Sequence, residues 1–404
     1  MAEIQVYGAP WCPDCRRSKK FLGEHRVEYD WIDIDTDAEG LRFVEELQNG
    51  GRTIPTIIFP DGSSLLEPSN EELARKLGLN IEAERAFYDL AIIGGGPAGL
   101  AAGIYAAREG IDAIIVDGGS LGGQAGVTER VDNYPGFPDG IEGGELADRF
   151  VRQARRYGVE MLEAVSVSDL RADEQEGDVS LTLSSGQEIN AHAALIATGS
   201  SYRRLEVPGE DGLIGAGVHF CATCDGPFYR GSEELLVIGG GNSGLEEGLF
   251  LTNFAERVRI LERSPELKGS QLLQDKVLSH PAIEVHTSTE VVELLGRGGR
   301  LQEVRARNSE SGEDLSWSPA GVFVFIGLTP NTEFLRGAVE LDEWGFVASE
   351  GFATSLEGVY VAGDVRAGST KQLGSATGDG IAALLAVREY LGRHGHMLEA
   401  AHPA

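Results

Sequence analysis

The chain repeats one strand–turn–helix–strand pattern, and this repeat constrains its fold more than any other feature. The first copy runs from Leu90 through GGGPAG to Asp117, and the second runs from Leu235 through GGGNSG to Glu262. In each copy the acid stands 18 positions after the third glycine. Such glycines make the turn, let the backbone approach a pyrophosphate and let helix and strand pack closely. The repeat therefore predicts two Rossmann-like domains.

Two such modules predict two bound dinucleotides. A flavin and a nicotinamide are the natural pair, because hydride passes directly between their rings. Asp117 suits a ribose hydroxyl of FAD, whereas Glu262 suits the adenosine 2′-hydroxyl of NADH and would repel a 2′-phosphate. We therefore expect FAD and NADH, with NADPH as the alternative because Arg263 adjoins Glu262.

The charge and apolar content of the chain limit the classes of partner that it can bind. The net charge is 34 − 64 = −30, which disfavours nucleic acids and anionic membranes because both attract clustered Lys and Arg. The chain has no apolar run of ~18 residues and no secretory signal at its start, so we expect a cytoplasmic protein. Glycine is in excess at 55 of 404 residues, and 48 of the 55 follow residue 80. The excess therefore belongs to the dinucleotide-binding part.

Four cysteines form two C-x-x-C pairs, Cys12/Cys15 and Cys221/Cys224. Paired cysteines in a cytoplasmic chain indicate redox or metal chemistry. The pairs lie about 200 residues apart, against ~15–20 in a zinc ribbon, so we expect no metal. The spacing of Cys221 and Cys224 lets their sulfurs bridge, and the adjacent Asp225 is placed to protonate a leaving thiolate.

Residues 2–80 read as a separate small unit. Its order of elements, βαβαββα, is that of a thioredoxin-type fold. We expect strands at 3–7, 27–33 and 53–59, and helices after Cys12, at 37–48 and at 71–77. The span 79–88 contains no Pro or Gly, and we expect it to be partly helical.

Residues 88–394 resemble the thioredoxin reductase family. The matching stretches are IIGGGPAGLAA, LGGQ, VDNYPGF, ATG, CATCDGPF, VIGGGNSG, IGLTPNT and VAGDV with the later KQ. The resemblance implies a homodimer whose FAD domain is built from two segments, with the nicotinamide domain inserted between them. The implied division is 1–80 small domain, 81–87 linker, 88–203 and 326–395 FAD domain, 204–325 NAD(P)H domain and 396–404 tail.

The resemblance also implies roles for individual residues. Cys224 would be the sulfur facing the flavin, Cys221 would attack the partner disulfide, and Asp225 would be the acid. Residues at the FAD positions are Gly94, Gly96, Pro97, Ala98, Gly99, Asp117, Gly123, Gln124, Asn133, Thr198, Gly199, Gly363, Asp364, Lys371 and Gln372. Residues at the nicotinamide positions are Gly239, Gly241, Asn242, Ser243, Gly244, Glu262 and Arg263.

One departure favours NADH. Thioredoxin reductases of this type usually carry a His-Arg-Arg cluster at the second acidic position, which binds the NADPH phosphate. Here the segment is Leu261-Glu262-Arg263-Ser264. It looks more like the NADH-using flavoprotein subunit of alkyl hydroperoxide reductase.

The N-terminal unit is similar to glutaredoxins, and within them to mycoredoxin-like members. The matching residues are WCPDC from Trp11 and TIPT from Thr53. This similarity implies that Cys12 is the nucleophile, Cys15 the resolving thiol and Pro55 a cis proline beside them. Two interpretations of a basic cluster remain, and its residues are Arg16, Arg17, Lys19 and Lys20. We favour a solvated helix face, and the alternative is a site that attracts an anionic thiol electrostatically.

These features predict an electron relay within one chain or across a dimer. Electrons from NADH pass through FAD and Cys221–Cys224 to Cys12–Cys15, and then to an external disulfide. The alternatives are an NADH-dependent peroxiredoxin (alkyl hydroperoxide) reductase and a reductase of mixed disulfides of small thiols. From another class, the N-terminal unit would be an iron–sulfur or docking module.

Overall fold

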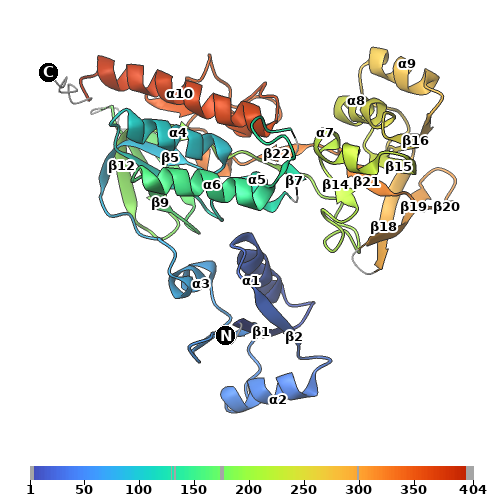
Figure 1. Ribbon diagram of the computed structural model, residues 1–404, viewed down its shortest axis with the longest axis horizontal. Helices are drawn as coiled ribbons and strands as arrows, with labels where there is room; N and C mark the ends of the chain where they lie inside the picture. Colours follow the sequence, from blue (N-terminus) through green and yellow to red (C-terminus); the bar gives the residue numbers. More distant parts are fainter. Residues whose placement is uncertain (1–3, 129, 132, 173–176, 298–299, 397–404) are drawn as a thin grey trace. The chain divides into compact units, whose positions relative to one another are not determined.

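The computed structural model describes residues 4–128, 130–131, 133–172, 177–297 and 300–396. The chain divides into two compact units, drawn in Figure 1. Unit 1 comprises residues 1–127, 143–199 and 330–404, and unit 2 comprises residues 128–142 and 200–329. Unit 2 is thus inserted in unit 1, as the resemblance implied.

The N-terminal part of unit 1 has the thioredoxin-type order that the sequence predicts. Its four-stranded sheet runs β2-β1-β3-β4, with β1 parallel to β2 and antiparallel to β3. The strands are β1 (Ile4–Gly8), β2 (Tyr29–Asp33), β3 (Thr56–Ile58) and β4 (Ser64–Leu66), and the helices are α1 (Pro13–Glu24), α2 (Ala38–Leu47) and α3 (Asn70–Leu77).

Local sequence signals set the ends of these helices. Helix α1 begins with Pro13 at its first position, where a missing N–H costs nothing. A capping box starts α3, since Ser69 and Glu72 exchange hydrogen bonds. Gly78, at φ +74°, ends that helix.

The segment after α3 contains no helix: residues 79–86 are irregular, with bends, and β5 begins at Phe87. The expectation of partial helix over 79–88 is therefore wrong. Several polar groups of this segment form hydrogen bonds to residues of the larger part of unit 1. Asn80 donates to the Met161 carbonyl at 3.2 Å, and the backbone of Ala83 exchanges two hydrogen bonds with the Gln187 side chain. These contacts compete with the i→i−4 bonds that a helix would need.

The larger part of unit 1 is built around one long strand, β12 (Glu188–Ile196). On one side it lies parallel to β5 (Phe87–Ile93). On the other, its first half pairs with β11 (Val179–Leu183) and its second half with β23 (Val359–Val361). The sheet is completed by β6 (Ala113–Val116), β9 (Glu160–Leu162) and β10 (Val167–Ala172). Strand β23 thus joins the two distant segments of the domain.

Alternate residues of β5 feed two separate cores. Leu90 and Ile92 pack in a cluster with residues of α4 (Pro97–Arg108), α6 (Gly143–Arg156) and α10 (Leu373–Arg393). Ala91 and Ile93 pack in another cluster on the opposite face. Burial on both faces explains why this strand is a continuous apolar run rather than an alternating one.

Unit 2 repeats the parallel architecture. Its five-stranded sheet runs β14-β21-β15-β16-β17, and α8 (Asn242–Leu251) joins β15 (Ser232–Ile238) to β16 (Ala255–Leu261). The other strands are β14 (Val218–His219), β17 (Ile283–His286) and β21 (Gly321–Val324). The other helices are α7 (Ala222–Asp225), η1 (Gly226–Tyr229) and α9 (Gln271–Ser279). An antiparallel sheet holds β18 (Thr289–Arg297), β19 (Arg300–Asn308) and β20 (Asp314–Trp317).

The remaining elements are short. They are α5 (Gly123–Val127), β7 (Arg130–Val131), β8 (Ile141–Glu142), β13 (Ser200–Tyr202), β22 (Leu328–Pro330), η2 (Glu333–Leu335) and η3 (Gly363–Val365). β13 pairs with β22, and β7 pairs with β8.

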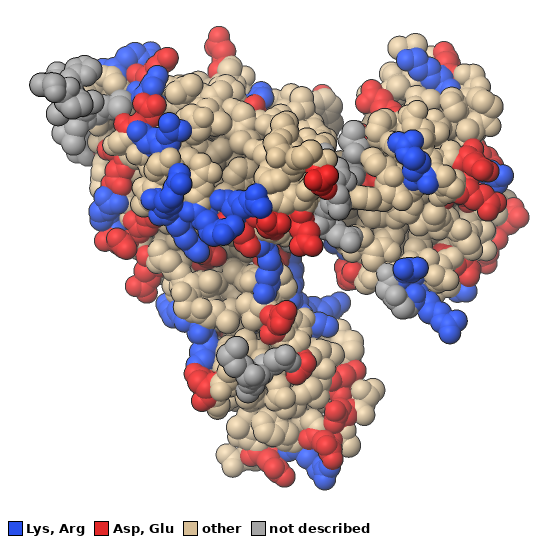
Figure 2. All heavy atoms as spheres, in the orientation of Figure 1, with Lys and Arg blue, Asp and Glu red and all other residues tan. Residues whose placement is uncertain are grey.

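Charges of both signs are interspersed on the face drawn in Figure 2. Many cations of the described residues have acidic partners, as in the pairs Arg149–Glu145 and Arg155–Glu163. Among the described residues, none of the helices is both long and apolar enough to cross a membrane.

Candidate functional site

The turn between β5 and α4 leaves room for a phosphate. A Cβ on Gly99 would lie 1.9 Å from the Gly94 carbonyl oxygen, and one on Gly94 would lie 2.4 Å from the Ala197 oxygen. A Cβ on Gly96, in contrast, would meet no atom within 4 Å. Gly96 is also the N-cap of α4 and gives it no side-chain cap. The start of the helix is therefore uncapped by a side chain and open beside Gly96, which suits a pyrophosphate.

The turn between β15 and α8 has the same construction. A Cβ on Gly244 would lie 1.9 Å from the Gly239 carbonyl oxygen, whereas one on Gly241 would meet nothing within 4 Å. Gly239 has φ +122°, a conformation that favours glycine. The loop that follows Glu262 closes against this turn, since Ser270 donates its N–H to the Asn242 side chain at 2.7 Å. In both modules the space beside the second glycine is therefore open, as the close approach of a phosphate requires.

The acidic residue of each module, Asp117 or Glu262, accepts hydrogen bonds from the backbone of its own glycine turn and of the residues that follow the acid. Asp117 accepts N–H groups from Gly95 at 2.6 Å and Gly119 at 2.7 Å. Glu262 accepts from Gly240 at 2.7 Å and Ser264 at 2.8 Å. Each carboxylate oxygen keeps a lone pair for a ribose hydroxyl.

The pKa values of the two acids are shifted in opposite directions. Burial raises the pKa of Asp117, and its backbone hydrogen bonds only partly oppose this. At Glu262 burial acts in the same direction, but hydrogen bonds from Ser264 and Gly240 outweigh it, so its pKa lies below the usual value. Glu262 is therefore held as an anion, the form that repels a 2′-phosphate.

The C-terminal part of unit 1 supplies the second half of the flavin site. The Gly363 turn lies against α4, because a Cβ there would be 3.0 Å from the Ala98 Cβ. Asp364 follows it, and its Oδ1 is buried without a hydrogen-bond partner among the described residues. An orphaned carboxylate oxygen is costly, and a ribityl hydroxyl of FAD would satisfy it. The residues therefore fit the cofactor that the sequence predicts.

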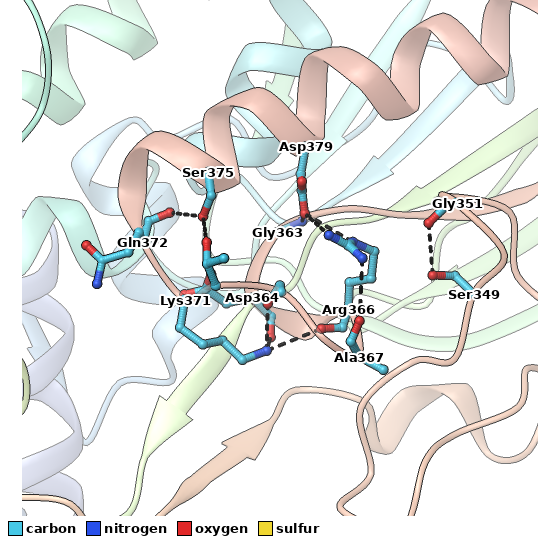
Figure 3. Close-up of polar contacts among 12 residues, drawn as sticks. Ser349, Gly351, Gly363, Asp364, Arg366, Ala367, Lys371, Gln372, Ser375 and Asp379 are labelled. Atoms are coloured by element: carbon cyan, nitrogen blue, oxygen red, sulfur yellow. Dashed lines mark hydrogen bonds and ion pairs between the residues drawn. The ribbon is translucent and has the colours of Figure 1, made fainter. Parts of the chain in front are cut away.

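Lys371 braces this corner of the site, as Figure 3 shows. Its ammonium donates to the carbonyls of Asp364 and Arg366 and to the Ser369 hydroxyl. Burial lowers its pKa to about 8. Burial also raises the pKa of Asp364, against which the Lys371 charge acts.

The structure brings most of the predicted FAD residues together within unit 1. Gly123 faces the turn, since a Cβ on it would be 3.1 Å from the Gly96 Cα. Pro97 and Ala98 begin α4, Gln124 lies in α5, and Gln372 is the N-cap of α10. Thr198, next to Gly199, exchanges two hydrogen bonds with Asn331. Asn133 falls in unit 2, so its role stays a prediction.

The nicotinamide residues lie together in unit 2. Asn242 and Ser243 begin α8, and Arg263 is exposed beside Glu262. Lys268, which sequence reasoning missed, donates its backbone N–H to the Gly240 carbonyl, and its charge helps to lower the pKa of Glu262.

The second cysteine pair is also in unit 2. Cys221 is in a disulfide, and its carbonyl accepts the Asp225 N–H at 3.0 Å. Cys224 belongs to α7, but its side chain lies outside the described residues. The structure adds His219, which sequence reasoning missed. Its Nδ1 lies 3.5 Å from the Asp225 carboxylate. Its position two residues before Cys221 was the available signal.

The first cysteine pair lies at the start of α1, where both residues are buried, Cys12 at 5% exposed and Cys15 at 0%. Cys12 is the N-cap of α1, and its Sγ accepts the Cys15 N–H at 3.2 Å. Cys15 is fully buried, and burial raises the pKa of its thiol to about 12. The peptide bond between Ile54 and Pro55 is cis, as predicted, and the Ile54 carbonyl is 3.7 Å from Cys12 Sγ.

Among the described residues, three of the four basic residues named above, all except Arg16, have local partners. Arg17 pairs with Asp14, Lys20 lies 3.7 Å from Glu24, and the Lys19 ammonium sits 4.3 Å from the centre of the Trp31 ring. This supports the interpretation of a solvated helix face.

Comparison with known proteins assigns the family. The sequence profile of the pyridine nucleotide-disulphide oxidoreductases matches residues 88–380, and that of the glutaredoxins matches residues 4–63. The chain belongs to the pyridine nucleotide-disulphide oxidoreductase family. It is a thioredoxin reductase-like flavoenzyme with an N-terminal glutaredoxin domain, as the sequence predicted.

Individual relatives agree. The thioredoxin reductase of Mycolicibacterium smegmatis is 38% identical over 313 residues, 77% of this chain and 99% of the relative. NADPH-dependent thioredoxin reductase 3 of Arabidopsis thaliana is 37% identical over 328 residues, 78% of this chain but only 60% of the relative. The crystal structure of thioredoxin reductase from Streptococcus pyogenes matches with a TM-score of 0.71 at 34% identity, covering 76% of this chain and 99% of that one.

The two glycines of the flavin turn should fail in different ways. Gly96→Ala should fold normally but lose FAD, because its Cβ enters the space left for the pyrophosphate. Gly99→Ala should lower the stability of the apoprotein by about 1–3 kcal/mol, the usual cost of overpacking. Flavin titration and thermal unfolding of the apoproteins measure the two effects, and wild-type FAD affinity in Gly96→Ala would contradict the assignment.

The thiols of the glutaredoxin domain should differ in reactivity. At about pH 8 only a ~10⁻⁴ fraction of a thiol with a pKa of about 12 is ionised, so iodoacetamide should label Cys12 long before Cys15. Peptide mass spectrometry of the reduced protein reads this out. Equal labelling of the two residues would show that the Cys15 thiol is not protected.

Proposed function

We propose that this enzyme passes electrons from NADH to an external protein disulfide through two dithiols on one chain. Bound FAD would accept hydride from the nicotinamide and make its electrons available to the Cys221–Cys224 disulfide. This dithiol would reduce Cys12–Cys15 by thiol–disulfide exchange, and Cys12 would attack the acceptor. The proposal is carried by the Cys12 site in the same chain as the flavoenzyme. Cys12 is the N-cap of α1, its Sγ accepts the Cys15 N–H, and the resolving Cys15 thiol is fully buried.

Fusion gives the relay a physical advantage. Tethering raises the effective concentration of the second dithiol to ~mM without any added affinity. Glutaredoxin disulfides lie ~40–70 mV above that of thioredoxin, so the last internal transfer would be downhill by roughly 2–3 kcal/mol. The transfer would occur within the chain or across a homodimer in the cytoplasm.

We keep the predicted domain division, with residues 81–87 as the linker. The hydrogen bonds of Ala83 to Gln187 and of Glu84 to Glu160 hold this segment along unit 1. A large movement of the small domain would therefore either break these hydrogen bonds or occur by rotation at the residues near Gly78.

The nucleotide preference rests on Glu262. Its anchored anion favours a ribose 2′-hydroxyl over a 2′-phosphate. The Arabidopsis relative is named as NADPH-dependent, and Arg263 and Lys268 are the cations here that would serve a phosphate. We propose NADH because Glu262 is fixed by two backbone N–H groups, whereas both cations are exposed.

Two other acceptors remain as second candidates. A peroxiredoxin is favoured by the likeness of the 261–264 segment to the alkyl hydroperoxide system. A mixed disulfide of a small thiol is favoured by the mycoredoxin-like motifs, and it needs only one attacking sulfur. The iron–sulfur alternative is the weakest, because Cys12 and Cys15 are both placed for dithiol chemistry.

Replacement of the first cysteine tests the relay. Cys12→Ser should reduce acceptor-dependent NADH oxidation by at least about 10²-fold, since the attacking thiolate is lost. Flavin bleaching by NADH in the absence of an acceptor should stay at the wild-type rate. Full turnover in Cys12→Ser would rule out the relay.

Replacement of the resolving cysteine, Cys15, tests which class of acceptor the enzyme reduces, when the variant is assayed with a panel of acceptors. The panel comprises thioredoxin, a peroxiredoxin with peroxide, and mixed disulfides of glutathione, mycothiol and bacillithiol. Cys15→Ser should stop reduction of protein disulfides, which need a resolving thiol. Retention of protein disulfide reduction in Cys15→Ser would contradict the dithiol route.

Steady-state kinetics test the nucleotide preference. We expect kcat/KM to favour NADH by about 10–100-fold, and Glu262→Gln to reduce this ratio by about tenfold as the charge repulsion is removed. Glu266→Gln, an exposed acid in the same loop, is the matched control and should keep the wild-type ratio. A wild-type preference for NADPH would refute the role of Glu262.

A further inference from the structure

His219 is a buried histidine directly ahead of the redox cysteines. It ends β14, and its side chain is only 8% exposed. Both ring nitrogens have partners: Nδ1 lies 3.5 Å from the Asp225 carboxylate, and Nε2 lies 2.6 Å from the Tyr229 hydroxyl. A histidine linked on both sides in this way has the arrangement of a proton relay.

Separate elements of unit 2 build this arrangement. Tyr229 ends η1, and its ring fits against β21 because residue 321 is glycine. A Cβ at Gly321 would lie 2.6 Å from the Tyr229 Cζ. Phe323, also in β21, packs against the imidazole at 5.2 Å between ring centroids. Asp225 is held near Cys221 by the hydrogen bond from its N–H to the Cys221 carbonyl.

The chemistry at this pair consumes a proton. Reduction of a disulfide by a pyridine nucleotide follows NADH + H⁺ + RS–SR → NAD⁺ + 2 RSH. The S–S bond breaks, two electrons and one proton arrive from the nicotinamide as hydride, and a second proton must come from the surroundings. A carboxylic acid in water is ionised at neutral pH, whereas an imidazole is close to its midpoint. A histidine behind the acid would therefore keep a proton within reach.

We propose that His219 positions Asp225 and reloads it with the proton that the leaving sulfur takes up. In the protonated form of His219 the Nε2–H donates to the Tyr229 hydroxyl oxygen and the Nδ1–H faces the Asp225 carboxylate. Transfer of the Nδ1 proton to Asp225 leaves a neutral imidazole, which takes up its next proton from solvent. Among the described side chains, Asp225 from α7 and Tyr229 from η1 are the titratable groups facing the ring, and β21 contributes the uncharged Phe323. The proposal rests on the redox role given above to Cys221 and Cys224.

The decisive variant is His219→Asn in the full-length, FAD-loaded protein. Asparagine keeps an N–H donor near the Nδ1 position but cannot carry a proton. Anaerobic mixing with NADH, followed by alkylation and mass counting of the Cys221–Cys224 peptide, gives the rate of thiol formation. We expect this rate to fall about tenfold and to lose its pH dependence between about pH 5.5 and 8. Flavin bleaching should be unchanged.

Other variants separate a relay from a structural role. Tyr229→Phe should retain the pH dependence with a displaced midpoint. His192→Asn alters another histidine paired with an aspartate, at 2.8 Å from Asp178, and should behave as the wild type. A wild-type pH profile in His219→Asn, with or without a lower melting temperature, would overturn the proposal. Acceptor turnover that survives Cys221→Ser would instead overturn the underlying function.

Discussion

The contact that the rest of the structure depends on is the approach of a helix to a strand at each glycine turn. In both modules a Cβ on the third glycine would lie 1.9 Å from the carbonyl oxygen of the first. No side chain fits there, so the helix starts directly at the end of the strand. Its unpaired N–H groups then face the gap beside Gly96 or Gly241. At the predicted sites phosphate affinity would follow from backbone geometry and would need no basic residue, which agrees with the acidity of the chain.

The same approach explains why the flavin domain needs two chain segments. Helix α10 packs against the start of α4, where a Cβ on Gly380 would lie 2.1 Å from the Ala98 carbonyl oxygen. β23 pairs with β12 in the sheet, so the Gly363–Asp364 turn arrives beside the phosphate gap. A domain inserted between the two segments leaves this junction intact, because the junction is made by strand pairing and helix contact rather than by the connecting chain.

The sequence predicted what backbone rules determine. Glycine spacing, a buried strand and an acid at a fixed distance specify each turn, and the cis bond before Pro55 followed from its family motif. What depends on tertiary contacts was not predicted. The non-helical linker is held by Gln187, over 100 residues away, and the orphaned oxygen of Asp364 arises from burial by other segments. His219 was missed because its significance lies in Tyr229 and Asp225, which only folding brings to it.

The two dithiols are provided with protons in opposite ways. Burial and the nearby Asp14 charge both raise the pKa of Cys15, so this thiol holds its proton until a mixed disulfide on Cys12 must be resolved. At Cys221, by contrast, Asp225 and His219, which lie 3.5 Å apart, would in their proposed roles deliver a proton as the disulfide opens. A dithiol that is easily protonated on reduction but reluctant to ionise would release electrons slowly. In the proposed relay, one pair would be reduced rapidly and the other would release its electrons only to a disulfide that has already reacted with Cys12.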